Sequence, residues 1–148
     1  MIIYEKESVD NKLFRLQEMV KVLEEIRTSS KGEFLKDHKL YGAGMFNLMI
    51  GITIILDIGQ HLLTRYAQRT AKEYKEVIAM LGEEQIITAE FAVANIEMAK
   101  FRNLMVHDYD KIDETMVYDY IQKAPDIFRQ FAKYFVEFMD KQEEDIKN

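Results

Sequence analysis

One short stretch, residues 102–109, combines side-chain types that the core of a helical protein does not need. Arg102 carries a permanent positive charge, Asn103 an amide, and His107 an imidazole that titrates near about pH 6.5. In a helix, Asn103 and His107 share a face because they are four residues apart. Arg102 and Tyr109, seven residues apart, share an adjacent face. The spacing therefore predicts one groove lined by all four side chains, which can hold an anion and exchange a proton.

The same stretch also has a purely structural interpretation. His107 can interact with the C-terminal end of its own helix, where a positive charge suits the helix dipole. Arg102 has acidic neighbours with which it can form an ordinary ion pair, and these are Glu97, Asp108 and Asp110. Because many such pairs are structural, the residue types alone favour this interpretation over a catalytic one.

A second candidate site is basic. Arg65, Arg69 and Lys72 follow one another at spacings of four and three, so a helix through them presents all three on one face. The formal net charge of −6 argues against general nucleic-acid binding, because phosphate affinity comes mainly from Lys and Arg. Any RNA contact must therefore be local. These residues are candidates for it, and an ordinary solvated helix face is the alternative.

No pattern predicts a metal or a cofactor. Asp57 and His61 lie four apart and can bind a metal or orient each other, but no Glu-x-x-His pair accompanies them, which favours a satisfied polar pair. The absence of cysteine excludes disulfides, thiolate zinc sites and a cysteine nucleophile. Residues 42–44, Gly-Ala-Gly, lack the Lys-Ser/Thr continuation of a phosphate-binding loop.

Apolar residues recur at alternating steps of three and four along most of the chain, which predicts amphipathic helices. Five helices are expected: from about Ser8 to Thr28, from about Glu33 to near Arg69, over Tyr74–Leu81, from the cap Thr88 through Leu104, and from a cap within residues 110–113 to about Met139. The fold class is therefore all-α, an up-and-down bundle of four or five helices.

Three positions are expected to interrupt or end these helices. Gly82 is placed to stop the third helix. Pro125 should kink or restart the fifth, because proline has no amide hydrogen and its ring crowds the preceding turn. The acidic residues after Met139 predict a fraying end.

The second predicted helix is the most apolar part of the chain. Its glycines, Gly42, Gly44 and Gly51, each cost about 1 kcal/mol relative to alanine, so they make sense if another helix packs closely there. Asp57 closes the apolar run 45–56 well short of the roughly 20 residues that cross a bilayer. This segment is predicted to be a buried core helix, since no second β-like run exists with which it could pair.

The composition fits one folded domain over residues 1–148, with 48% hydrophobic residues, 31% charged residues and a single proline. The first six residues lack the basic start and apolar segment of a secretory signal. We therefore expect a cytoplasmic protein with no membrane association.

The pattern R-x-x-x-x-H-x-Y at Arg102, His107 and Tyr109 is similar to the motif of HepT-like ribonuclease toxins of the HEPN family. In that family a polar residue usually follows the arginine, as Asn103 does, and the motif precedes the last long helix. The second helix, ending near His61, also resembles the family pattern. The resemblance covers nearly the whole chain and reverses the preference for a structural interpretation. It implies metal-independent RNA cleavage by a homodimer whose two motifs face each other.

The residue types suit that chemistry. Cleavage by the 2′-hydroxyl requires a proton acceptor, a proton donor for the leaving 5′-oxygen, and positive charge beside phosphorus. His107 can exchange the protons, Arg102 can hold two phosphate oxygens, and Asn103 can orient the phosphate or the histidine. One chain supplies one such histidine, so a twofold axis is a simple way to obtain an acid and a base.

The resemblance also implies a partner. In this type VII-like toxin-antitoxin arrangement, a MntA-like nucleotidyltransferase antitoxin adenylylates the tyrosine at the position of Tyr109, and the added charge and bulk beside Arg102 obstruct RNA. The alternative is a non-catalytic HEPN module that docks on, or presents substrate to, a nucleotidyltransferase. The intact Arg102, Asn103 and His107 favour the enzyme.

Overall fold

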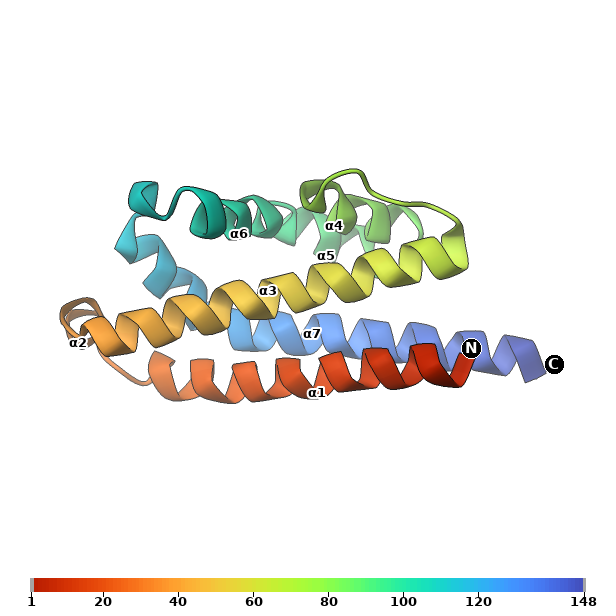
Figure 1. The fold of residues 1–148 in the computed structure, drawn as a ribbon, viewed down its shortest axis with the longest axis horizontal. Helices are drawn as coiled ribbons and strands as arrows, with labels where there is room; N and C mark the ends of the chain where they lie inside the picture. The colour runs from red at the N-terminus through yellow and green to blue at the C-terminus, as the bar shows by residue number, and fades with distance from the viewer. Residues whose placement is uncertain (1, 148) are drawn as a thin grey trace.

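Three long helices run side by side and form the body of the molecule (Figure 1). They are α1 (Ile2–Arg27), α3 (His38–Ala67) and α7 (Glu114–Lys147) in a computed structural model that describes residues 2–147. A second layer covers the side of α3 that faces away from α1, and it contains α4 (Tyr74–Glu83), α5 (Ala89–Asn95) and α6 (Met98–His107). The short α2 (Lys31–Lys36) packs on α3 and α7, and the 3-10 turn η1 (Tyr109–Lys111) follows α6.

The all-α prediction is confirmed, and residues 2–147 contain no strand. The number of helices differs from the prediction because two expected helices are each divided into two. One division lies at Asp37, whose non-helical backbone (φ −95°, ψ 104°) separates α2 from α3. Its Oδ1 accepts hydrogen bonds from the amides of Lys39 (2.9 Å) and Leu40 (3.2 Å), as an N-cap does. The other division lies at residues 96–97, between α5 and α6.

Two of the predicted caps are confirmed. Thr88 accepts a hydrogen bond from the Phe91 amide at 3.1 Å and begins α5. Asp113 accepts one from the Thr115 amide at 2.9 Å and precedes α7. The prediction for Gly82 is wrong, because α4 continues to Glu83. A Cβ at Gly82 would lie 2.6 Å from the Cβ of Ala92 in α5, so this glycine permits close packing of α4 and α5.

Helix α7 is continuous through Pro125, so the predicted restart is wrong. The predicted kink is present, because Figure 1 shows the first turns of α7 inclined to the rest of the helix. Near the bend, Arg27 Nη1 donates to the carbonyl oxygen of Gln122 at 3.2 Å. The predicted fraying end is also wrong. The helix extends to Lys147, and Glu143 forms an ion pair with Lys6 of α1 at 2.9 Å.

The core lies where α3 meets α1 and α7. Its largest fully buried side chains include Leu23 of α1, Ile52 and Ile55 of α3, and Phe128 and Phe131 of α7. Among the described residues, α3 is the one helix long and apolar enough to cross a membrane, with a mean hydropathy of 1.6 over its most apolar window. Half of that window is buried inside the bundle, as the core position of α3 requires.

One side of α3 is polar and faces the second layer. Thr53, Asp57, Gln60 and Thr64 lie three or four residues apart on this side, and we call them the α3 polar stripe. Gln60 Nε2 donates to the Ala71 carbonyl oxygen at 2.8 Å, and Gln60 Oε1 accepts from the Ala71 amide at 3.1 Å. This pair of bonds fixes the loop from which α4 begins.

The predicted close packing at glycines of α3 is confirmed at two positions and not at the third. A Cβ at Gly44 would lie 2.7 Å from Ile121 Cδ1, and one at Gly51 would overlap the ring of Phe128. Nothing lies within 4 Å of a Cβ at Gly42. The first two glycines therefore allow α7 to approach α3.

These distances predict opposite effects of alanine in one helix. Gly51→Ala should lower the free energy of unfolding by about 1–3 kcal/mol, because its methyl group meets a buried ring. Gly42→Ala should raise the free energy by about 0.5–1 kcal/mol, because alanine favours the helix and meets no neighbour. Urea denaturation followed by circular dichroism measures both. Equal effects of the two changes would contradict the packing.

Candidate active site

Arg102 reaches across from α6 to the central helix. Its Nε donates to Thr53 Oγ1 of the α3 polar stripe at 2.9 Å, and its Nη1 donates to Asn103 Oδ1 at 3.0 Å. The Thr53 hydroxyl in turn donates to the carbonyl oxygen of Met49 at 2.9 Å. Because that hydroxyl has a single hydrogen, it presents a lone pair to Arg102.

The face of the same guanidinium lies over an aromatic ring. Arg102 Cζ is 4.9 Å from the ring centroid of Tyr74, at the start of α4. The Tyr74 hydroxyl donates to Asp57 Oδ1, also in the α3 polar stripe. The hydrogen bond to Asp57, partial burial and the Asp57 charge raise the pKa of Tyr74, while Arg102 opposes them. Tyr74 therefore remains a neutral donor at physiological pH.

The structural interpretation of Arg102 as an ion-pair partner is wrong. Within residues 2–147 no carboxylate pairs with Arg102. Glu97 pairs with Lys100 at 3.4 Å and Asp108 with Lys111 at 3.9 Å. The guanidinium is held by two neutral oxygens and an aromatic face, so its charge is not neutralised by direct contact with an acid.

His107 is the last residue of α6, and its side chain is exposed. Residues five apart in a helix point about 140° away from each other, so His107 and Arg102 leave α6 in different directions. Asn103, four residues before His107, shares its side of the helix. In the described part of the chain, no hydrogen bond or ion pair engages the His107 imidazole, which leaves both of its nitrogens to solvent.

Tyr109 does not lie on the helix that carries the other three residues. The backbone leaves the helical conformation at Asp108 (φ −137°, ψ 44°), and Tyr109 opens η1. The predicted helical relation between Arg102 and Tyr109 is therefore wrong. The side chain of Tyr109 is 72% exposed, which makes its hydroxyl accessible to a second protein.

The predicted basic helix face is also wrong in its geometry. Helix α3 ends at Ala67, and its cap Gln68 adopts a left-handed conformation (φ 50°), so Arg65 alone of the three predicted residues lies on the helix. Arg69 Nη1 lies 2.8 Å from Glu83 Oε2 in α4. Lys72 lies in the following loop, where its amide donates to Glu76 Oε2 at 3.1 Å.

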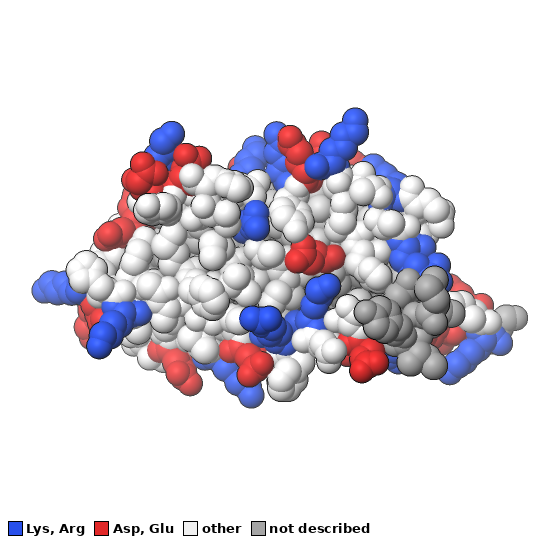
Figure 2. All heavy atoms as spheres, viewed as in Figure 1, with Lys and Arg blue, Asp and Glu red and all other residues white. Residues whose placement is uncertain are grey.

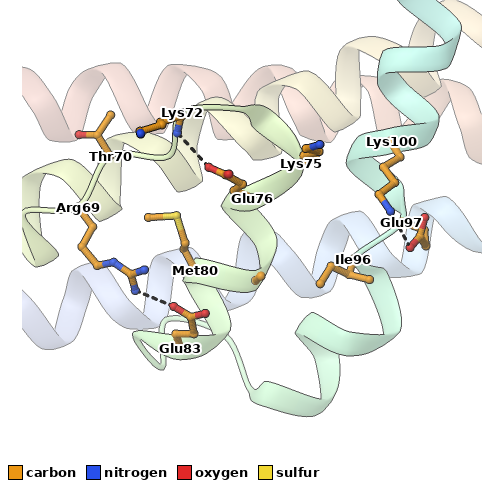
Figure 3. Close-up of a pocket in the computed structure, with 11 residues that line it drawn as sticks. Arg69, Thr70, Lys72, Lys75, Glu76, Met80, Glu83, Ile96, Glu97 and Lys100 are labelled. Carbon is orange, nitrogen blue, oxygen red and sulfur yellow. Dashed lines mark hydrogen bonds and ion pairs between the residues drawn. The ribbon is translucent and has the colours of Figure 1, made fainter.

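Arg69 and Lys72 line a surface pocket of about 850 Å³, together with Lys75 of α4 and Lys100 of α6. Figure 3 shows acidic side chains interleaved with these cations, with Glu83 directed at Arg69 and Glu97 beside Lys100. Positive and negative groups nearly balance here. The pocket is therefore not a concentrated phosphate site.

The predicted pair of Asp57 and His61 does not form a hydrogen bond in the described residues, since Asp57 binds Tyr74 instead. His61 lines a small pocket beside Tyr66 of α3 and Met139 of α7. Among residues 2–147, no group of three or more His, Cys, Asp or Glu is arranged to hold a metal ion.

Thr53 was not among the predicted site residues, and Tyr74 was predicted to be a core position. A hydroxyl within an otherwise Ile-rich run was the available signal for Thr53, because such a group needs a partner when buried. Asp57 lies four residues after Thr53, and Tyr74 begins the next helix. Nothing local in the sequence connects either residue with Arg102.

Known proteins resemble this chain over most of its length. Residues 16–135 match the family described as "Ribonuclease HepT-like". The tRNA nuclease HepT of Aphanizomenon flos-aquae is 32% identical over 85 residues, which span 55% of this chain and 58% of that protein. The mRNA nuclease HepT of Shewanella oneidensis is 22% identical over 121 residues, 82% of this chain and 90% of that protein.

Solved structures have the same fold. A tri-AMPylated Shewanella oneidensis HEPN toxin, solved in complex with MNT antitoxin, superposes with a TM-score of 0.78 at 20% identity, covering 87% of this chain and 96% of that one. The cytosolic protein YutE of Bacillus subtilis also gives a TM-score of 0.78, at 16% identity, covering 93% and 92%. These likenesses show that the chain shares the all-α fold of those proteins.

The geometry predicts that Asp57→Asn lowers the pKa of Tyr74 toward its ordinary value near 10, because the charged acceptor becomes neutral. An NMR titration of ring-labelled tyrosine, with Tyr74→Phe for assignment, measures the pKa. Tyr41 and Tyr120 also have raised pKa values, from burial and other acids, and serve as internal controls. An unchanged pKa of Tyr74 in Asp57→Asn, or an equal change in the pKa of all three tyrosines, would refute the Asp57–Tyr74 contact.

Proposed function

The chain belongs to the HepT-like ribonuclease family, and from that premise we propose that it is a metal-independent endoribonuclease toxin that cleaves RNA with Arg102, Asn103 and His107. The observation that carries this proposal is the state of Arg102. Its guanidinium is positioned by neutral partners, has no direct carboxylate partner among residues 2–147, and lies on the same helix as an exposed imidazole. That combination suits a phosphate ligand better than a structural ion pair.

Each motif residue has a distinct role in this proposal. Arg102 holds phosphate oxygens and stabilises the charge that develops on them. His107 transfers a proton to or from the reacting oxygens. Asn103 accepts a hydrogen bond from Arg102 through Oδ1, so its amide hydrogens remain to orient the phosphate or the imidazole. Relatives described as a tRNA nuclease and an mRNA nuclease support RNA as the substrate class.

A homodimer would complete the site. Arg102 and His107 leave α6 in different directions, and each chain has one motif imidazole, so a second copy supplies the missing acid or base. Figure 2 shows that the middle of the face over α3 carries few charged side chains. Phe46 is 50% exposed in α3, on the side that continues through Ile50 to Thr53. An uncharged surface beside Arg102 suits a self-association interface.

A MntA-like nucleotidyltransferase antitoxin is the proposed partner, with Tyr109 as its target. Support comes from the similar Shewanella oneidensis toxin, which is described as tri-AMPylated and in complex with MNT antitoxin. Tyr109 is exposed and follows the motif helix directly. Adenylylation of Tyr109 would add negative charge and bulk at the end of that helix and oppose the approach of RNA.

Outside the motif, Arg65, Arg69 and Lys72 are proposed to contact RNA. Lys72 and Arg65 are exposed, and Arg65 Cζ lies 5.5 Å from the ring centroid of Tyr66. Arg69 would have to exchange its bond with Glu83 for a phosphate. Lys75 and Lys100 line the same pocket as Lys72 and are further candidates. With these few cations among many acids, RNA binding should be local and weakened by salt. A cytoplasmic location without membrane association accords with this substrate.

If His107 transfers a proton in the reaction, His107→Ala should abolish RNA cleavage. The fold should be retained, because the His107 side chain is exposed at the end of α6. The loss should be about 100- to 10,000-fold, as for other general acid-base residues. Arg102→Ala should lose a comparable factor. Arg102→Lys should also lose much of the activity, because it keeps the charge without the planar fork. The measurement is cleavage in EDTA, with circular dichroism to confirm folding.

Adding an excess of folded His107→Ala protein to the wild type tests the shared site in the same assay, since a mixed dimer would contain one motif imidazole where acid-base catalysis requires two, and cleavage should fall. Cleavage of RNA by folded His107→Ala at the wild-type rate would refute the catalytic assignment. The better hypothesis would then be a non-catalytic HEPN module that docks on, or presents substrate to, a nucleotidyltransferase.

Modification of Tyr109 gives a separate prediction. Incubation with the partner nucleotidyltransferase and ATP should add AMP mass to the peptide that contains Tyr109, because this side chain is 72% exposed. Tyr109→Phe should remain unmodified and should stay active in the presence of the partner. Adduct mass only on Tyr118, which packs against Phe34, or on another tyrosine would contradict the proposed mechanism.

A further inference from the structure

Two side chains outside the family motif, those of Thr53 and Tyr74, contact the guanidinium of Arg102, and a third, that of Asp57, holds Tyr74. Thr53 and Asp57 belong to the α3 polar stripe, and Tyr74 begins α4. We propose that Thr53, Asp57 and Tyr74 form a clamp that positions Arg102 for phosphate binding, an inference that rests on the proposed ribonuclease function. We call these three residues the Arg102 clamp.

Thr53 fixes the rotation of the guanidinium. Its Oγ1 accepts from Arg102 Nε at 2.9 Å while its own hydrogen goes to Met49. Asn103 Oδ1 accepts a hydrogen bond from one N–H group of Arg102 Nη1. Two of the five guanidinium N–H groups are therefore used within the protein, and three remain for a ligand.

Tyr74 fixes the plane of the guanidinium. Its ring lies against one face of the group, at 4.9 Å between Arg102 Cζ and the ring centroid, which restricts tilting. The tyrosine is itself held, because its hydroxyl donates to Asp57. Asp57 thus acts on Arg102 through Tyr74, without placing a carboxylate on the guanidinium where it would compete with phosphate.

The clamp should matter most for the chemical step. A preorganised donor stabilises charge as it develops in the transition state, whereas a mobile arginine can still attract the RNA chain. Loss of the clamp should therefore reduce kcat more than it raises KM. Thr53, Asp57 and Tyr74 are positioning residues in this view, since none is required to touch the RNA.

Matched variants separate positioning from folding. Thr53→Val removes the acceptor at nearly constant volume, while Thr53→Ser retains the hydroxyl. Tyr74→Leu removes the ring, while Tyr74→Phe retains the ring and loses the hydrogen bond to Asp57. Under single-turnover conditions with a fluorescent tRNA and an unstructured RNA, Thr53→Val and Tyr74→Leu should each slow cleavage about tenfold. Thr53→Ser should stay within about twofold of wild type.

Combination with Arg102→Ala tests whether the clamp acts through the arginine. In that background Thr53→Val and Tyr74→Leu should have no further effect on cleavage, because the group that they position is gone. An undiminished tenfold loss in the Arg102→Ala background would show that they act through the fold, and the clamp would be rejected. Wild-type cleavage rates in Thr53→Val and Tyr74→Leu would reject it as well.

A readout without RNA keeps the two proposals distinguishable. The Arg102 Nε–Hε resonance, assigned by its loss in Arg102→Lys, should exchange slowly with water in the wild type and in Thr53→Ser, and rapidly in Thr53→Val. Slow exchange in a wild type that cleaves no RNA would sustain the positioning of Arg102 and reject the ribonuclease. Equal exchange in Thr53→Ser and Thr53→Val would reject the clamp even if RNA is cleaved.

Discussion

The bond between Arg102 and Thr53 exists because α3 cannot bury all of its surface in apolar contacts. This helix supplies more fully buried aliphatic side chains than any other helix, and one polar side of it faces α4 and α6. Each residue of the α3 polar stripe finds a partner there: Thr53 binds Arg102, Asp57 binds Tyr74, Gln60 binds Ala71 and Thr64 contacts Thr70. Thr53, Asp57 and Gln60 are half-buried, and a half-buried polar group without a partner costs free energy, so these contacts help to fix the second layer on α3.

The same constraint explains how one arginine can be both fixed and charged. An acid in direct contact would hold Arg102 firmly but would neutralise it and compete with phosphate. A threonine hydroxyl, an asparagine oxygen and an aromatic face hold the guanidinium without either effect. The acid that the network does contain, Asp57, is one side chain farther away. Structural demands of the core and chemical demands of the site are therefore met by the same contacts.

If the chain is a ribonuclease, as proposed, the distribution of charge limits where RNA can bind. With a net charge of −6, most of the surface repels a polyanion, and the cations near α4 alternate with glutamates. The middle of the face over α3 is largely uncharged instead (Figure 2). Binding would then depend on a few cations close to the motif, so a single added AMP beside it could outweigh them. In the proposed mechanism, a weakly attractive surface would make RNA binding sensitive to modification of Tyr109.

Much of this molecule was predictable from local pattern. The helical period, the caps Thr88 and Asp113, and the order of Arg102, Asn103 and His107 are local properties, since each depends on residues within a few positions. The break at Asp37 was missed although its capping side chain was visible, because the apolar period continues on both sides of it. The clamp was not predictable: Thr53 lies 49 residues from Arg102, and only the packing of α6 on α3 brings them together. Helical periodicity gives the face that a residue occupies, but the neighbour on that face depends on how whole helices pack.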